Sequence, residues 1–117
     1  MIEIEDQFDV DSAEKLVALG YPDNKESLAD LLFWSCFPND PVAWITAPYI
    51  LSLKTEELAP ALAAFIEFHL RANQRELIDD VFCVVDVKEH RGISELTLSH
   101  ISDPLIRRWA ASKKILE

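Results

Sequence analysis

Glycine content is the feature that most constrains the fold of this chain, because only Gly20 and Gly92 occur among its 117 residues. An average protein contains about 7% glycine, and tight β-hairpins depend on glycine at positions of positive φ. A hairpin-rich β architecture is therefore disfavoured, whereas helices need few glycines. Half of the residues are hydrophobic, which supplies a core and disfavours disorder. We predict a single all-α domain over residues 1–117.

Apolar residues at three- and four-residue spacing, together with capping residues, predict where the helices lie. The expected helices begin at Asp11 or Ser12, after Asn24 as a cap, at Asp40-Pro41, at Thr55, at about Arg75 and at Ser94. The last helix is expected to have Pro104 in its first turn and Ser102 or Asp103 as its cap. Gly20 is expected to end the first helix and Pro38 the second. Pro48 is expected to kink or divide the third helix, because proline removes a backbone donor. Pro60 predicts either a later start for the fourth helix, near Ala59, or a distorted first turn.

The segment from Arg75 to Arg91 allows two predictions. Its dense β-branched residues, Val81 to Val87, and the alternation around Leu96 and Leu98 are compatible with an α+β fold that has a β-hairpin at about 81–101. Apolar residues at helical spacing, acidic residues at the start and basic residues at the end favour a helix instead. Gly92 would then be its C-terminal cap. We predict the helix.

The C-terminal segment carries a recognisable pattern. Asp103-Pro104-Leu105-Ile106-Arg107-Arg108-Trp109-Ala110-Ala111 resembles the turn and second helix of a HEAT-type helical repeat. The pattern of that family is Asp-Pro, one residue, an aliphatic residue, Arg, two residues and then two small residues. Asp40-Pro41 begins a comparable helix, but Ile45 and Thr46 stand where the family has its arginine.

The resemblance implies three stacked helical hairpins, at about 25–53, 56–91 and 94–116, or else an irregular helical bundle. In the family, the Asp and the Arg form a hydrogen-bonded ladder between successive repeats. Three such units are about the minimum for a stable stack. Proteins of this kind act as recognition surfaces, so the resemblance implies binding and not catalysis.

Negative charge is concentrated at the N-terminus. Residues 1–30 contain nine carboxylates against Lys15 and Lys25, a net charge of −7 within a total of −10. Such a field repels phosphate backbones and attracts basic surfaces, so we expect no direct binding of nucleic acid and a protein partner with a basic surface. The expected partner-binding residues are the acidic side chains nearest to the N-terminus: Glu3, Glu5, Asp6, Asp9, Asp11 and Glu14. A surface that merely keeps the protein in solution is the alternative.

Motifs for catalysis and cofactor binding are missing from the sequence. Two separated glycines allow neither a dinucleotide fingerprint nor a P-loop, and no Gly-x-Ser-x-Gly or His-Glu-x-x-His sequence occurs. No histidine follows a glutamate by three positions, as it does in carboxylate-bridged diiron bundles. We therefore expect no catalytic residue, no metal ligand and no cofactor.

The three histidines are expected to be structural. His69 is predicted to be partly buried and hydrogen-bonded. Asp86 and His90 would pair on the surface at a helix end, and two ligands are too few for a closed metal site. His100 is predicted to pair with Asp103 across a turn between helices.

Targeting signals are also missing from the sequence. No apolar run approaches the ~18 to 20 residues that a membrane span requires, and the N-terminus is acidic where a secretory signal is basic. The protein is therefore expected to be cytoplasmic. Cys36 and Cys83 lie in apolar surroundings without a second nearby cysteine, so both are predicted to be buried free thiols.

Three functional hypotheses follow. The first is an acidic protein-binding domain, similar to the immunity proteins or inhibitors with which bacteria neutralise basic toxins or enzymes that act on nucleic acids. The second is a structural or adaptor module that self-associates through apolar surface around Trp34, Phe37 and Trp44. The third is a small enzyme, which requires a pocket where histidines and carboxylates converge.

Overall fold

The computed structural model describes residues 2–85 and 90–112, and in these residues all regular secondary structure is helical. The elements are α1 (Val10–Leu19), the 3-10 turn η1 (Lys25–Ser27), α2 (Leu28–Ser35), α3 (Pro41–Ser52), α4 (Thr55–Arg71), α5 (Arg75–Val84), α6 (Ile93–His100) and α7 (Pro104–Ser112). The prediction of an all-α fold is confirmed. None of these helices is both long and apolar enough to cross a membrane.

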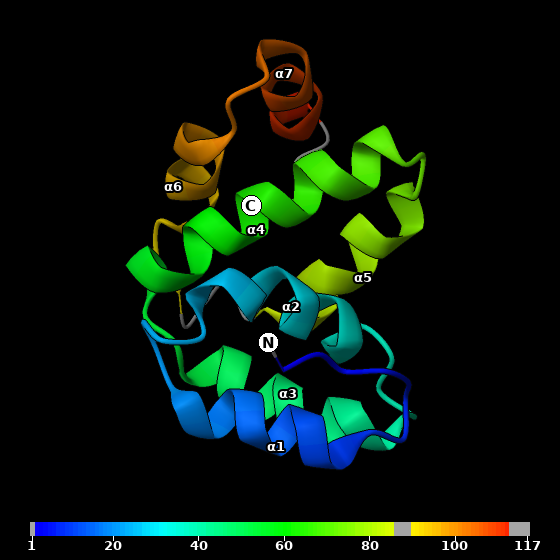
Figure 1. The fold of residues 1–117 in the computed structure, drawn as a ribbon. Coiled ribbons are helices and arrows are strands. Elements are labelled where there is room, and N and C mark those ends of the chain that lie inside the picture. The colour runs from blue at the N-terminus through cyan, green and yellow to red at the C-terminus, as the bar shows by residue number, and fades with distance from the viewer. Residues whose placement is uncertain (1, 86–89, 113–117) are drawn as a thin grey trace.

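Two helices, α2 and α4, lie at the centre of the fold. Figure 1 shows α1 and α3 side by side on one side of α2, and α6 and α7 beyond α4 on the other. α5 packs against both central helices. Fully buried side chains of α2 and α4 form the middle of the core: Leu28, Leu31, Leu32, Leu58, Leu62, Phe65 and Ile66. Each contributes about 1.5–3 kcal/mol by leaving water, so these two helices hold the fold together.

The expected hairpins are adjacent in space. α2 contacts α3, α4 contacts α5, and α6 contacts α7, while the first helices of successive hairpins meet as α2 on α4 and α4 on α6. Asp103 accepts a hydrogen bond from Arg71 of the preceding hairpin (3.5 Å). The Nε of Arg107 instead donates to the carbonyl of Ile101 in its own turn (3.1 Å). Membership of the HEAT family stays a prediction.

The first helix begins slightly earlier than its expected caps, Asp11 or Ser12. Asp9 caps it, because its Oδ1 accepts the backbone N–H of Ser12 (3.3 Å). Gly20 ends the helix with φ +71°, a left-handed conformation that glycine adopts without steric cost. The predicted end at Gly20 is therefore confirmed.

Asn24 does not cap the second helix, contrary to the prediction. It is buried, and its Nδ2 donates to the carbonyl of Leu16 and to the hydroxyl of Tyr49, both at 2.9 Å. Asn24 therefore ties the end of α1 to α3. The sequence signal for a cap is local, whereas these two partners become available only when the helices pack.

Neither proline inside a helix divides it. α3 continues past Pro48 to Ser52, and α4 begins at Thr55 although Pro60 lies within it. Glu57 fixes that start by accepting the backbone N–H of Lys54 (2.9 Å). Both prolines are exposed, so they lie on helix faces where water can bond the carbonyls that lose a donor.

The alternative β-hairpin at 81–101 is wrong for the described residues, since α5 and α6 occupy 75–84 and 93–100. The predicted helix ends earlier than expected, because Val85 is already extended (φ −80°, ψ 119°). Gly92 is not a C-terminal cap but the residue before α6, with φ +77°. Residues 86–89, including the predicted helical Val87 and Lys88, lie outside the described part of the chain.

The last hairpin is anchored on α4. Asp103 caps α7 by accepting the backbone N–H of Leu105 (2.9 Å), as predicted. Glu67 of α4 accepts the backbone N–H groups of Ser102 (2.7 Å) and Asp103 (3.2 Å). The predicted helices from Ser94 and Pro104 are therefore present, although the expected continuation to 116 passes beyond the last described residue.

Glu67 makes the attachment of this hairpin sensitive to acid. Burial by itself would raise the pKa of Glu67, but the hydrogen bonds from Asp103 and Ser102, together with Arg71, outweigh it and lower the pKa. A carboxylate whose pKa is lower in the folded state stabilises the protein above its unfolded pKa, and that stability is lost as the pH falls through the folded value.

We expect Glu67→Gln to lower the free energy of unfolding by about 1 kcal/mol at about pH 7, a modest value because water partly screens the carboxylate. The difference from the wild type should be smaller at a second, acidic pH, because the stabilisation is lost as the wild-type carboxylate is protonated through its lowered folded-state pKa. Urea unfolding at both pH values measures it. Glu95→Gln, at an exposed position on α6, is the control. An equal loss at both pH values would contradict the role of the charge.

Candidate protein-binding surface

The predicted acidic residues lie on the segment before α1 and on α1 itself. Five of the six, Glu3, Glu5, Asp6, Asp11 and Glu14, are exposed, and Asp9 is half-buried. In Figure 1 this N-terminal segment, drawn in dark blue, runs from between the ribbons of α2 and α3 to the start of α1. The structure therefore leaves most of the predicted carboxylates accessible.

Two of the six have structural contacts. Besides Ser12, Asp9 accepts the backbone N–H of Glu5 through Oδ2 (3.0 Å). The backbone bond from Glu5 contributes most to lowering the pKa of Asp9, followed by the side chain of Ser12. Asp6 accepts the backbone N–H of Phe8 (2.9 Å). Asp9 and Asp6 therefore shape the N-terminal turn, while Glu3, Glu5, Asp11 and Glu14 remain available.

The negative charge of this surface is not neutralised within the described residues. The ion pairs found there both involve Arg71, which contacts Glu67 (3.9 Å) and Asp103 (3.5 Å) at the other end of the molecule. Lys15 on α1 lowers the pKa of Asp9 but is not part of either ion pair. The negative charge of the acidic surface therefore remains available to attract a basic partner.

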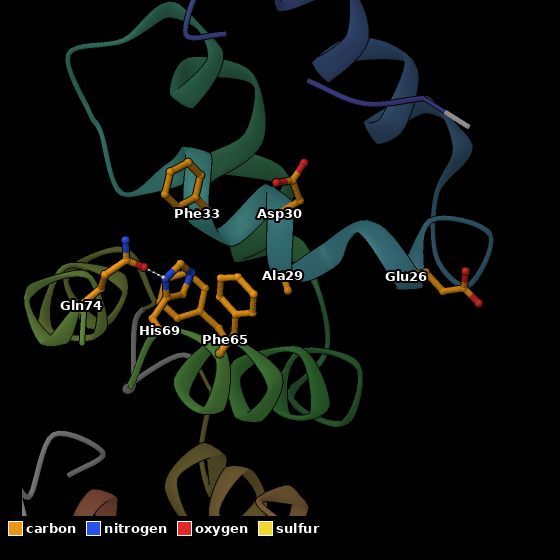
Figure 2. A pocket seen from close by; sticks show the side chains of 8 residues that line it. Glu26, Ala29, Asp30, Phe33, Phe65, His69 and Gln74 are labelled. Carbon is orange, nitrogen blue, oxygen red and sulfur yellow. Dashed lines mark hydrogen bonds between the residues drawn. The ribbon is translucent and has the colours of Figure 1, made fainter. Parts of the chain in front are cut away.

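A cavity of about 460 Å³ lies between α2 and α4, close to the start of α5. Its lining combines aromatic rings with carboxylates, and the principal residues are Glu26, Asp30, Phe33, Phe65, Phe68 and His69. In Figure 2 the rings of Phe33, Phe65 and His69 gather at one side, and Glu26 stands apart at the other. Phe68 is 67% exposed, so an aromatic surface is open to solvent here.

The cavity continues into the predicted acidic surface. A neighbouring hollow shares Glu26 and Asp30 with it and adds Glu3. Burial raises the pKa of Asp30, and the nearby carboxylate of Glu3 raises it further. The charged form of Asp30 is therefore less favoured than in a fully solvated aspartate, and a nearby cation would favour it.

Sequence reasoning did not identify Glu26, Asp30 or Phe33 as functional. Asp30 and Phe33 lie three positions apart on α2, a helical spacing that was present in the sequence, and Glu26 precedes them in η1. The facing residues Phe65 and Phe68 come from α4, and nothing local indicates that α4 packs beside this face of α2.

No family model, curated protein or solved structure matches the chain. Function must therefore be inferred from the surface itself.

His69 is at the aromatic side of the cavity, where it is buried and hydrogen-bonded as predicted. Its Nδ1 lies 2.8 Å from Oε1 of Gln74, and its ring centroid lies 4.2 Å from that of Phe65 and 5.0 Å from that of Phe68. An amide oxygen only accepts, so Nδ1 carries the proton with Gln74 in this orientation. In the neutral ring, Nε2 is then an acceptor.

The other two histidines differ from the predictions. His90 is not on the surface but buried, with Nε2 2.8 Å from the carbonyl of Leu53. Asp86, its predicted partner, lies outside the described residues. His100 is exposed and does not pair with Asp103, whose carboxylate bonds α7 and Arg71 instead.

The two cysteines also differ from each other. Cys36 is buried as predicted, and burial raises the pKa of its thiol to about 12. Cys83 is exposed, so its predicted burial is wrong. Cys83 lies on the outer side of the amphipathic helix α5, and its apolar neighbours Phe82 and Val84 gave a misleading local signal.

The arrangement offers little for catalysis. His69 shares the cavity with Glu26 and Asp30, but no hydrogen bond joins its ring to either carboxylate, and Figure 2 shows Glu26 directed away from it. Among residues 2–85 and 90–112, no group of three or more His, Cys, Asp or Glu side chains is placed to hold a metal ion. What the surface does offer is negative charge next to exposed aromatic rings.

Proposed function

We propose that this chain is a non-catalytic, acidic protein-binding domain that recognises a basic surface on another protein. A partner that acts on nucleic acids fits the proposal, because such proteins carry basic surfaces of their own. The chain would then inhibit a toxin or enzyme by covering that surface, as immunity proteins do. A cytoplasmic location and HEAT-like stacking belong to the same proposal.

One observation carries this proposal: Glu3, Glu5, Asp11 and Glu14 are exposed and form no ion pair within the described residues. Charges of one sign on one surface speed the association with an oppositely charged partner and oppose binding to wrong ones. Direct binding of nucleic acid is disfavoured by the same field.

The test compares three immobilised proteins that capture partners from an extract of the source organism. One is the wild type. The second carries Glu3→Gln, Glu5→Gln, Asp11→Asn and Glu14→Gln, and spares Asp6 and Asp9 because they bond the backbone. The third, a control of equal net charge, carries Glu76→Gln, Asp79→Asn, Asp80→Asn and Glu95→Gln at exposed positions elsewhere.

We expect the wild type and the control to capture the same proteins, with an isoelectric point above about 9. The N-terminal variant should capture at least about tenfold less of them, because several charges that steer association are lost. Mass spectrometry identifies the proteins, and assays of their nuclease activity with and without the chain test inhibition. Equal capture by all three proteins would refute the acidic surface as the binding site.

Self-association is the second candidate function, and one apolar surface supports it. Trp44 and Leu51 of α3 are 66% and 43% exposed, and they line a hollow with Pro48. Trp34 and Phe37, which were predicted to share this role, are partly buried against the core. The exposed apolar surface is therefore narrower than expected.

If this surface forms a dimer, we expect Trp44→Ala to weaken dimerisation by at least about tenfold, since buried tryptophans dominate many interfaces. Sedimentation velocity over a range of concentrations measures the effect. Phe8→Ala, which removes another exposed ring (68%), is the control. A wild type that stays monomeric at all concentrations would exclude self-association.

A further inference from the structure

We propose that the cavity between α2 and α4 binds an arginine side chain that projects from the basic protein partner. The identity of that partner rests on the proposed function, whereas the chemistry of the cavity rests on its own residues. Acceptors for a cation and aromatic faces for a planar group occur together here, and guanidinium is the protein group that uses both.

The acceptors come from η1 and α2 and from the aromatic side of the cavity. Asp30 of α2 and Glu26 of η1 both line the cavity, with Glu26 at the side away from the rings (Figure 2). His69 adds Nε2, which has no hydrogen-bond partner within the described residues, while Nδ1 is bonded to Gln74. A carboxylate accepts two parallel bonds from guanidinium, and Nε2 can accept a further one.

The aromatic rings of the cavity supply the surface on which the guanidinium group would stack. Phe33 and His69 lie nearly parallel, with an angle of 9° between their planes and centroids 5.9 Å apart, and Phe68 meets His69 edge-on. Phe68 is largely exposed although it is apolar. Because Phe33 and His69 already stack on each other, a guanidinium plane would stack on the exposed ring of Phe68, and the apolar stem of arginine would cover ring surface that now faces water.

The carboxylates and the rings of the cavity disfavour other occupants. Anions are repelled by Glu26, Asp30 and the neighbouring Glu3, and a purely apolar side chain would bury these carboxylates without a partner. Lysine would pair with a carboxylate, but its compact, strongly hydrated ammonium group lacks a plane to stack on the rings. Guanidinium alone among these groups combines a positive charge for the carboxylates with a plane that can stack on the rings.

The test uses small probes on the intact chain. N-acetylarginine amide, N-acetyllysine amide and N-acetylcitrulline amide are titrated separately while the backbone amide signals are followed by NMR. Citrulline has the shape of arginine without the charge. We expect the arginine probe to bind saturably, with a Kd in roughly the millimolar range, and to shift the signals of Ala29, Asp30, Phe33 and His69. The lysine probe should bind about fivefold more weakly, and citrulline at least about tenfold more weakly.

Variants locate the binding. Asp30→Asn and Phe68→Ala should each weaken the arginine probe by roughly fivefold or more, and neither should impair folding because both side chains are exposed. Asp79→Asn, an exposed acid on α5, is the matched control and should leave the Kd unchanged. Equal binding of arginine and lysine probes, shifts confined to other surfaces, or unchanged binding in Asp30→Asn would each overturn the inference.

The same variants separate this inference from the proposed function. If the N-terminal variant loses capture of basic proteins while Asp30→Asn and Phe68→Ala keep it, the protein-binding proposal stands and the arginine site fails. If the probe binds as expected and Phe68→Ala reduces capture, both stand. If the probe binds but capture is equal in all variants, the cavity still recognises arginine, and the inference fails in its claim of a basic partner.

Discussion

Replacing Phe65 with alanine is expected to lower the free energy of unfolding by about 3–5 kcal/mol, because it removes a fully buried ring from the contact between α2 and α4. The neighbouring structure cannot close the space, since α4 is also held by α5 and α6. The total free energy of unfolding of a native domain is about 5–15 kcal/mol, so the variant should be close to unfolding. Urea denaturation followed by circular dichroism measures the loss.

Phe68 provides a matched control on the same helix. Phe68→Ala removes the same ring from a position that is 67% exposed, and the expected change is within about 0.5 kcal/mol. A large loss in Phe68→Ala, or a small one in Phe65→Ala, would mean that α4 does not present this face to α2. The cavity would then be misplaced as well, because both phenylalanines line it.

Replacing His90 with alanine is expected to cost about 2–4 kcal/mol. The imidazole is buried, and its Nε2 donates to the carbonyl of Leu53 at the end of α3. Alanine leaves a void and a buried carbonyl without this donor, and the two costs add. The free energy of unfolding from urea titration at constant pH gives the magnitude.

Two further variants separate the contribution of the His90 hydrogen bond to stability from the effect of removing a histidine side chain in general. His90→Gln keeps a donor at nearly the reach of Nε2 and should recover part of the loss, whereas His100→Ala removes an exposed histidine and should change stability by less than about 0.5 kcal/mol. Similar stability of His90→Ala and His100→Ala would contradict the burial of His90.

The helices were largely predictable from local signals. The capping of α7 by Asp103 and the end of α1 at Gly20 depend on residues within one turn of the helix end, so sequence reading found both. The end of α5 was missed, because the apolar spacing continues beyond Val84 although the backbone becomes extended at Val85. A pattern of residues shows which segment can be helical, but not where packing stops it.

The candidate surface was predictable in part. The acidic N-terminal residues were identified from composition alone, and the structure exposes most of them. Their structural differences were not predictable, since Asp9 caps α1 through the backbone N–H of Ser12 and also accepts the backbone N–H of Glu5 in the preceding turn. The cavity was not predicted at all, because Asp30 and Phe68 belong to different helices whose contact is not encoded in any short segment.

Sequence alone determined the all-helical class and the acidic N-terminal surface, because backbone preferences and charge are properties of neighbouring residues. Tertiary structure alone decided that Asn24 and His90 are buried partners of distant backbone or hydroxyl groups and that Cys83 faces outward. It also decided that carboxylates of η1 and α2 share a cavity with rings of α4. Burial and hydrogen-bond partners depend on which helix faces meet, and that choice depends on the packing of the whole chain.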